Sequence, residues 1–288
     1  MTEAILGVIG GSGLYDMPGL TDVERRAVQT PWGMPSDDLV IGTLAGVRTA
    51  FVPRHGRGHR FTPTEVNYRA NVAALKMLGC QFVLSVSAVG SMKEEIPPGM
   101  LVVVDQFIDR TVARPRTFFG DGIVGHVPFS DPTCHVFRPL VRDAAKATGA
   151  GTHDGGTYLC IEGPQFSTRA ESLLYRSWGV HVIGMTGMPE AKLVREAGMS
   201  FSMLALATDY DCWHESEEAV SVEAVVATLK KNIATAQEVV RGVASRVAGI
   251  EQKSPFASIV DGAVMTSKDV YGHEARRRLR TIAGDLLG

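Results

Sequence analysis

The chain has 288 residues and a net charge of −2, with 45% hydrophobic and 21% charged residues. This composition is typical of a globular protein with a substantial core, and it excludes the strongly basic character of many nucleic-acid-binding proteins. The four cysteines are widely separated and fit no zinc or disulfide spacing. Because no segment has the pattern of a signal peptide or a membrane span, we expect a cytoplasmic protein with no membrane contact.

The predicted elements alternate between strands and helices along the chain. Apolar runs predict strands at residues 4–9, 39–44, 48–53, 82–87, 100–107, 180–185 and 203–207. Capping and periodicity predict helices at residues 62–79, 135–148, 168–178, 189–197 and 222–247, and another near the C-terminus. We therefore expect one α/β domain over residues 1–250, with a central sheet covered on both faces. Residues 251–288 are expected to form a partly helical extension packed on it.

Two carboxylates, Asp209 and Asp211, follow the strand predicted at residues 203–207. Ligands collect beyond the carboxyl ends of parallel strands, and in extended backbone both side chains would point to the same side. Adenine offers an acceptor at N7 and a donor at its 6-amino group, which a protonated and an ionised carboxyl group would match. The pair therefore predicts a clamp for a 6-amino purine. A solvated turn, in which Asp is common, is the alternative.

Four segments at predicted strand ends carry groups suited to one anion. They are the glycine-rich turn with Ser12, the basic loop with Arg54 and His55, the Ser87-Ala88 turn, and Thr186 before a helix. Backbone N–H groups, hydroxyls and arginine all hold oxyanions. Each segment also has a plain alternative: turn glycines, an exposed basic loop, or a helix-start residue that presents no N–H or hydroxyl to a ligand. His55 and His59 have the spacing of metal ligands on a helix, but the glycines and arginines around them argue against a metal.

Other candidates have a structural alternative of equal or greater weight. Phe166 could stack on a flat ligand, although burial in the core is the default for such a residue. Val222, Val225 and Val226 belong to the apolar stripe of a helix, and could also line a pocket. Residues 110–131 form a long predicted loop rich in Gly, Pro and Arg, which is more often functional than incidental.

Five segments, in this order, give the chain a resemblance to the 5′-methylthioadenosine phosphorylase family of the trimeric purine nucleoside phosphorylase superfamily. They are Gly10-Gly11-Ser12-Gly13-Leu14, Pro53-Arg54-His55-Gly56, residues 103–111, Glu162-Gly163-Pro164-Gln165-Phe166-Ser167 and residues 207–213. The chain departs from the family at Ser12, where the animal enzymes have Thr, and at Gly184 and Gly187, where larger residues often occur.

The resemblance implies a mixed, twisted sheet and the phosphorolysis of S-methyl-5′-thioadenosine to adenine and S-methyl-5-thio-α-D-ribose 1-phosphate, a reaction of purine and methionine salvage. It also implies a role for each matching residue. Phosphate would be held by Ser12, Arg54, His55, Ser87, Ala88 and Thr186. The base and ribose would meet Phe166, Ser167, Met185, Asp209 and Asp211, and the 5′ substituent would meet Val222, Val225, Val226 and a neighbouring subunit's His126.

Further expectations follow from this family. It implies a homotrimer, or a hexamer formed as a dimer of trimers, with inorganic phosphate as co-substrate and neither cofactor nor metal. Members that act on 6-oxopurine nucleosides carry Asn where Asp209 stands, so Asp209 favours adenine. Three alternatives stay open: a broader phosphorylase acting on adenosine or 6-oxopurine nucleosides, a nucleosidase that uses water, and a non-catalytic nucleotide-binding regulator.

Overall fold

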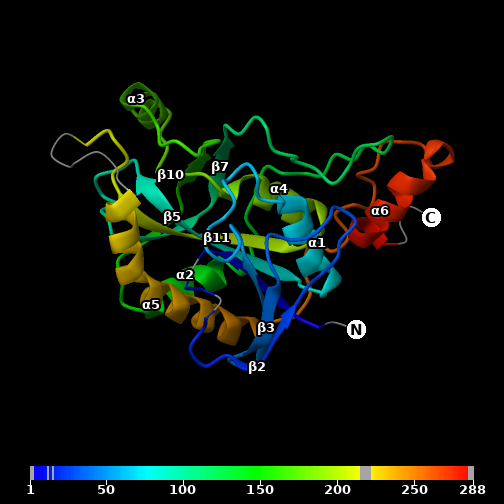
Figure 1. Cartoon of the computed structure of the whole chain (residues 1–288), viewed down its shortest axis with the longest axis horizontal. Helices are drawn as coiled ribbons and strands as arrows, with labels where there is room; N and C mark the ends of the chain where they lie inside the picture. Colours follow the sequence, from blue (N-terminus) through cyan, green and yellow to red (C-terminus); the bar gives the residue numbers. More distant parts are fainter. Residues whose placement is uncertain (1–2, 12, 15, 215–221, 285–288) are drawn as a thin grey trace.

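The computed structural model describes residues 3–284 except 12, 15 and 215–221. Within this part, strands and helices alternate around one large sheet (Figure 1). The strands are β1 (Leu6–Gly10), β2 (Thr21–Arg26), β3 (Leu39–Leu44), β4 (Val47–Pro53), β5 (Phe82–Ser91), β6 (Leu101–Val104), β7 (Gln106–Asp109), β8 (Thr152–Asp154), β9 (Thr157–Cys160), β10 (Val182–Gly184) and β11 (Ser200–Asp209). The helices are α1 (Tyr68–Met77), α2 (Phe137–Ala147), α3 (Arg169–Ser177), α4 (Gly187–Glu196), α5 (Val222–Val247), the short 3₁₀ helix η1 (Lys268–Val270) and α6 (His273–Ala283).

The sheet is mixed, as expected, and its strands run in the order β2-β3-β4-β1-β5-β10-β9-β7. A branch leaves this path at β5, which also pairs with β11; β11 in turn pairs with β6, and β6 with β8. Strands β4, β1, β5 and β11 are mutually parallel neighbours, so their carboxyl ends lie at one edge of the sheet. Ligands bind beyond such an edge in open α/β sheets.

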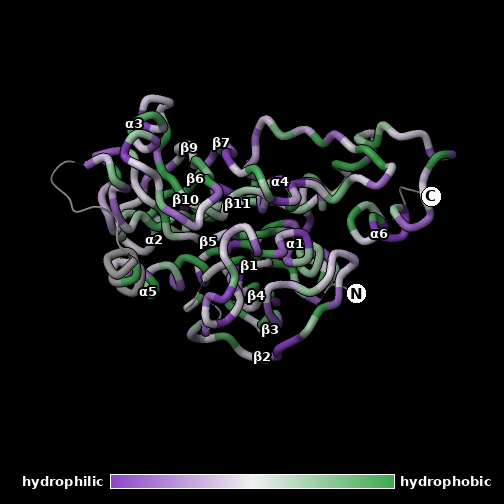
Figure 2. Tube along the Cα trace, turned by 45° about the horizontal axis from the view of Figure 1, so that its top comes forward, coloured by the Kyte–Doolittle hydropathy of each residue, from purple (hydrophilic) through white to green (hydrophobic). Residues whose placement is uncertain are grey.

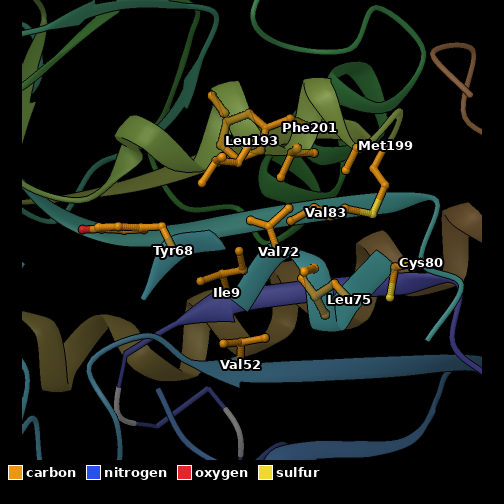
Figure 3. Close-up of a cluster of buried hydrophobic side chains, with 14 of the residues drawn as sticks. Ile9, Val52, Tyr68, Val72, Leu75, Cys80, Val83, Leu193, Met199 and Phe201 are labelled. Atoms are coloured by element: carbon orange, nitrogen blue, oxygen red, sulfur yellow. The ribbon is translucent and has the colours of Figure 1, made fainter. Parts of the chain in front are cut away.

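Helices cover both faces of the sheet, as expected, and each face has its own apolar core. On one face, residues of α1 and α4 pack with Ile9, Val52 and Val83 (Figure 3). Residues of α6 belong to the same cluster. On the other, residues of α2 and α5 pack with Leu6, Val8 and other strand residues. The central strands β1, β5 and β11 are buried over most of their length, and apolar stretches, green in Figure 2, run through the middle of the molecule.

The helix predicted from residue 62 begins six residues later than expected. The Thr62 hydroxyl lies 2.8 Å from a Glu65 carboxylate oxygen, but the four residues form only an isolated turn. Helix α1 is capped instead by Asn67, whose side chain accepts a hydrogen bond from the Ala70 N–H. Asn67 also donates to the Trp32 carbonyl at 2.8 Å. A contact between distant segments thus decides where the helix starts.

Several strand boundaries also differ from the expectation. The apolar run at residues 100–107 is broken at Asp105 into β6 and β7, and the short or polar strands β2, β8 and β9 were not predicted. β2 lies at an end of the sheet and is mostly exposed, so its residues lack the hydrophobic pattern that identifies a buried strand.

The segment after Ile250 packs on the same core as the preceding chain. Val260, Leu279 and Ile282 are buried in the cluster that contains Ile9 and Val83. Residues 110–131 contain neither helix nor strand and run toward this segment, where Gly125 and Val264 form an isolated bridge.

Candidate active site

A small pocket opens at the carboxyl ends of β1 and β4. It is lined by Gly10, Gly11, Pro53, Arg54, His55, Gly56 and His59. The glycine-rich turn and the basic loop, separated by some 40 residues, therefore form one site. Ser12, expected between them, lies outside the described residues.

Arg54 is buried at the base of this pocket, not exposed on a basic loop, with 2% of its surface accessible. Its Nε donates to Glu190 Oε1 at 2.6 Å and its Nη2 to Glu190 Oε2 at 3.2 Å, so the guanidinium fork faces a carboxylate of α4. Nη2 also donates to Ser85 Oγ, and Nη1 to the Val86 carbonyl. The bidentate face that we expected to hold an anion is occupied by Glu190.

The other two arginines of the loop also have a carboxylate partner. Arg57 forms an ion pair with Asp37, and Arg60 Nη2 lies 3.6 Å from Asp37 Oδ2. The positive charge of this loop is therefore largely paired with carboxylates of the protein. Anion binding here would depend more on hydroxyl and backbone N–H donors than on net charge.

His55 is held in one tautomer and is neutral at physiological pH. Its Nδ1 lies 2.9 Å from the Phe61 carbonyl, which fixes Nδ1 as the donor, and its ring stacks on His59 at 4.2 Å between centroids. Burial, reinforced by the Arg54 charge, lowers the pKa of His55 to about 4. Nε2 is then an acceptor, suited to a protonated phosphate oxygen.

The hydroxyls of Ser87 and Thr186 meet at 3.0 Å, although 99 residues separate them. Strand β10 runs antiparallel to the end of β5, with Ile183 opposite Gly90, and so returns the chain toward Ser87. The Thr186 N–H, which we expected to face an anion, instead donates to the Tyr158 hydroxyl at 3.2 Å. Ala88 is half-buried next to Ser87.

Asp209 and Asp211 come together, but not through extended backbone. Asp209 ends β11, and Asp211 has φ +54°, in the left-handed region, where Asp is better tolerated than most residues. The Asp211 N–H donates to Asp209 Oδ1 at 2.8 Å, and the Thr208 hydroxyl lies 2.7 Å from Asp209 Oδ2. The extended backbone that we expected through Asp211 is absent; a turn places both residues beside Gly90 instead.

Both carboxyl groups are only partly accessible, and this changes their acidity. Burial raises the pKa of Asp209, although the Thr208 hydroxyl and the Asp211 N–H oppose the shift. Burial likewise raises the pKa of Asp211, and the neighbouring Asp209 adds to it. A perturbed carboxyl pair at a strand end is typical of a functional site and argues against the solvated turn.

Strand β5 connects the two halves of the site. A Cβ atom on Gly90 would lie 3.0 Å from Asp209 Oδ1, so the acidic pair packs against the end of β5. Ser87 stands three residues earlier on the same strand, a separation of roughly 10 Å at about 3.3 Å per residue. The Ser87–Thr186 hydroxyl pair and the acidic pair therefore lie near the same end of β5.

The segment before α3 lies in contact with the same region. Phe166 is 44% exposed, so the default of core burial was wrong and its ring is free for stacking. Ser167 Oγ is buried with no hydrogen-bond partner among the described residues, and the Ser167 carbonyl accepts a hydrogen bond from Cys212. Met185 packs against Gly163, where an added Cβ would lie 2.6 Å from its sulfur.

Arg114, in the long loop at residues 110–131, was missed by sequence reasoning. Its buried guanidinium donates to the carbonyls of Met185 at 2.6 Å, Met188 at 2.8 Å and Glu162 at 2.6 Å, and to Glu162 Oε1 at 3.2 Å. It thereby joins the segment before α3 to the segment around Thr186. No local pattern identifies this role, because all its partners are distant in sequence.

The remaining candidates lie apart from this cluster or outside the described side chains. His126 is exposed, and its backbone N–H donates to the Ala263 carbonyl at 2.9 Å. Val226 is 39% exposed on α5, while the side chains of Val222 and Val225 are outside the described part. None of the contacts described for His126 joins it to Asp209 or Thr186.

Metal sites and membrane segments were searched over the described residues. No group of three or more His, Cys, Asp or Glu side chains there could hold a metal ion. None of the helices in that part is long and apolar enough to cross a bilayer. All four cysteines are free thiols.

Comparison with known proteins identifies the family of the chain. Residues 5–245 match the model of the phosphorylase superfamily. The S-methyl-5′-thioadenosine phosphorylase of Geobacter sulfurreducens is 56% identical over 99% of this chain and 100% of its own length, and that of Cereibacter sphaeroides is 50% identical over 99% of each.

Solved structures give the same result. A methylthioadenosine phosphorylase from an Antarctic soil metagenomic library is 46% identical, with a TM-score of 0.93 over 98% of this chain and 99% of its own. The Schistosoma mansoni methylthioadenosine phosphorylase in complex with adenine is 36% identical, with a TM-score of 0.87 over 91% of this chain and 99% of its own.

The fold is therefore that of the nucleoside phosphorylases, with a mixed sheet between helical layers. The chain belongs to the phosphorylase superfamily and, within it, to the S-methyl-5′-thioadenosine phosphorylase family.

Proposed function

We propose that the chain converts S-methyl-5′-thioadenosine and inorganic phosphate to adenine and S-methyl-5-thio-α-D-ribose 1-phosphate. The observation that carries the proposal is the placement of a buried acidic pair and a cluster of anion donors along one strand, β5. Ser87 and Gly90, which contacts the acidic pair, are three residues apart on this strand, a separation of roughly 10 Å. The names of the full-length relatives support the same substrate.

At the base end, Asp209 acts as the acid. Its raised pKa keeps a proton available, which it donates to N7 as the glycosidic electrons move into the purine. The Thr208 hydroxyl and the Asp211 N–H both bond to this carboxyl group and oppose the shift, so burial is what keeps the proton on Asp209.

Asp211 selects the base. Its carboxylate accepts a hydrogen bond from the 6-amino group of adenine, with Phe166 stacked on the ring and the unpartnered Ser167 hydroxyl beside it. A 6-oxopurine would place a second acceptor against Asp211. A mismatch of this kind costs about 1–3 kcal/mol, which is roughly ten- to hundredfold in rate.

At the phosphate end, the donors hold the nucleophile below C1′ of the ribose. Ser12, Ser87 and Thr186 supply hydroxyls, His55 accepts a hydrogen bond from hydrogen phosphate, and Ala88 supplies a backbone N–H. Arg54 is paired with Glu190, so it contributes little net charge, and it supplies the Nη1 hydrogen that is not bonded to the Val86 carbonyl. Phosphate is itself the co-substrate, and we propose no cofactor or metal.

The 5′ substituent requires a second subunit in this proposal. Val222, Val225 and Val226 line an apolar pocket for the methylthio group, and His126 of a neighbouring subunit completes it. This requires a homotrimer, or a hexamer formed as a dimer of trimers. Sedimentation or light-scattering mass would reveal either, and a monomeric mass with full activity would contradict it.

The setting of the proposed reaction is purine and methionine salvage. A cytoplasmic location fits the four free thiols, since reducing compartments keep cysteines unpaired.

The decisive experiment measures adenine release from S-methyl-5′-thioadenosine with and without inorganic phosphate. We expect release only with phosphate, together with a pentose 1-phosphate product. Release without phosphate would indicate a nucleosidase, and the absence of any product would indicate a regulator. Hypoxanthine release from inosine at an equal or higher rate would contradict the role of Asp211 and Asp209.

Adenosine is a second candidate substrate, to be compared in the same assay. A Schistosoma mansoni relative with a TM-score of 0.87 and 35% identity carries the name adenosine/methylthioadenosine phosphorylase. His126 of a neighbouring subunit could donate to a 5′-hydroxyl, and we expect adenosine to react more slowly than the methylthio nucleoside.

A further inference from the structure

Tyr158 lies in the middle of β9 and is fully buried beneath the segment that leads into α4. Its hydroxyl oxygen accepts hydrogen bonds from the N–H groups of Thr186 at 3.2 Å and Gly187 at 3.4 Å. These two residues lie at the entry to α4, before Met188, whose extended backbone (φ −116°, ψ 133°) separates them from the regular part of the helix. A phenol oxygen from another strand therefore holds the backbone of this entry segment.

The two glycines of this segment create the space for the phenol. A Cβ atom on Gly184 would lie 2.2 Å from the Tyr158 oxygen, and one on Gly187 would lie 3.1 Å from Tyr158 Cε1. Any side chain at position 184 would thus displace the hydroxyl. Gly184, Gly187 and Tyr158 form one steric unit, and the phenol occupies space that a larger residue at position 184 would need.

The phenol also determines which donors face the anion pocket. Because Tyr158 takes both N–H groups, the entry to α4 offers a ligand the Thr186 hydroxyl rather than its backbone. That hydroxyl lies within hydrogen-bonding reach of the Tyr158 hydroxyl and 3.0 Å from Ser87 Oγ. Burial raises the pKa of Tyr158, so the phenol stays protonated and holds this arrangement at any physiological pH.

We propose that Tyr158 is the positioning residue for phosphate: it fixes the Thr186 segment so that the Thr186 and Ser87 hydroxyls converge on the anion. This inference rests on the proposed phosphorolysis. It assigns a role in co-substrate binding to a residue that touches neither substrate. It also explains how a chain with glycine at positions 184 and 187 keeps an ordered phosphate site.

The test is Tyr158→Phe, which keeps the ring and its packing against Phe107, 5.5 Å away between centroids, and removes only the oxygen. We expect the KM for phosphate to rise about tenfold, the effect of leaving buried N–H groups without an acceptor. The KM for S-methyl-5′-thioadenosine and the kcat at saturating phosphate should change less than about threefold, because the acidic pair is untouched.

Phosphate binding is also measured without turnover, from the shift in unfolding temperature caused by inorganic phosphate alone. We expect the shift to be smaller for Tyr158→Phe than for the wild type. The two measurements test different proposals. The phosphate requirement in turnover tests the proposed phosphorolysis, which a nucleosidase would not show. The comparison of phosphate-induced shifts tests the role of Tyr158.

Two further variants complete the design. Thr49→Val removes a buried hydroxyl that bonds to the Val47 carbonyl away from the site, and should leave the phosphate KM unchanged. Gly184→Ala should raise the phosphate KM, since its methyl group displaces the phenol; it also serves if Tyr158→Phe fails to fold. The proposal is overturned if Tyr158→Phe and Gly184→Ala keep the wild-type phosphate KM, or raise both KM values equally.

Discussion

At the scale of single residues, burial gives Asp209 the property that an acid catalyst needs. Its pKa is raised because the carboxyl group is largely removed from water. The acid form therefore persists to higher pH than for an exposed Asp, and the rate should fall as the pH rises through that pKa. Because the folded pKa of Asp209 lies above the unfolded value, its contribution to the free energy of unfolding is also lost as the pH rises through the folded pKa.

Asp209→Ala should lower turnover by about 10²–10⁴-fold, the usual contribution of a general acid. The substrate KM should change less, since Asp211 still meets the 6-amino group. Asp143→Ala, an exposed carboxylate on α2, is the matched control and should be close to wild type. Initial rates at saturating phosphate measure the effect, and undiminished turnover in Asp209→Ala would remove the leaving-group role.

The lowered pKa of His55 predicts how the free energy of unfolding depends on pH. Its folded pKa, about 4, lies below the ordinary value of 6.5, so the unfolded chain binds a proton between these values that the folded chain does not. Its contribution to the free energy of unfolding is therefore complete above pH 6.5 and is lost as the pH falls toward 4. The loss is about 3 kcal/mol at about 1.4 kcal/mol per pKa unit.

His55→Gln should remove this dependence. Urea unfolding between pH 4 and 7.5 measures it, with the His59→Gln variant as control for the stacked neighbour. Equal pH profiles for wild type and His55→Gln would mean that His55 titrates normally in the folded protein.

At the scale of elements, two Thr-x-x-Glu motifs behave differently. Thr62 and Glu65, and Thr168 and Glu171, make the same hydroxyl–carboxylate contact at 2.8 Å. Only the second begins a helix, α3, because the residues after Thr168 continue in helical geometry. The local sequence predicted a helix start at both motifs. The contacts of Asn67, which caps α1 and bonds to Trp32, move the first start to Tyr68.

Thr168→Ala should therefore cost about 1 kcal/mol of stability, the usual value for a helix cap. Thr62→Ala should cost less, since its turn supports no helix. Thermal unfolding of the two variants makes the comparison, and equal losses would show that the caps are equivalent.

Arg114 holds two segments of the site through backbone carbonyls, so its loss should affect substrate binding as well as stability. We expect Arg114→Met to raise the nucleoside KM at least about tenfold and to lower the unfolding temperature, because several buried carbonyls lose their donor. Arg116→Met, two residues along the same loop and exposed, is the control. A normal nucleoside KM in a destabilised Arg114→Met would make the role purely structural.

At the scale of the whole molecule, the C-terminal segment belongs to the core. Leu279 on α6 is fully buried in the cluster that includes Val83 of the central strand. Leu279→Ala should cost about 2–5 kcal/mol, and Arg277→Ala, exposed on the same helix, should cost little. Denaturant unfolding should show one transition for both; a separate transition for the C-terminal segment would indicate an independent unit.

The convergence of the site also belongs to this scale. Gly10, Arg54, Ser87 and Asp209 are distributed over some 200 residues and meet because β1, β4, β5 and β11 are parallel neighbours. Strand order depends on which apolar faces pack together, and no segment of sequence encodes it alone. Motifs in the chain order of a known family were needed to predict the meeting of these residues.

The amino-acid sequence by itself determined the alternation of strands and helices, the buried strands β1, β3, β4, β5 and β11, and the chemistry available at their ends. It did so because apolar period, turn residues and side-chain type are local properties. Only the tertiary structure decided that Glu190 neutralises Arg54, that Tyr158 holds the entry to α4, and that Arg114 joins two segments. Those are contacts between residues far apart in the chain, and their geometry exists only once the core has packed.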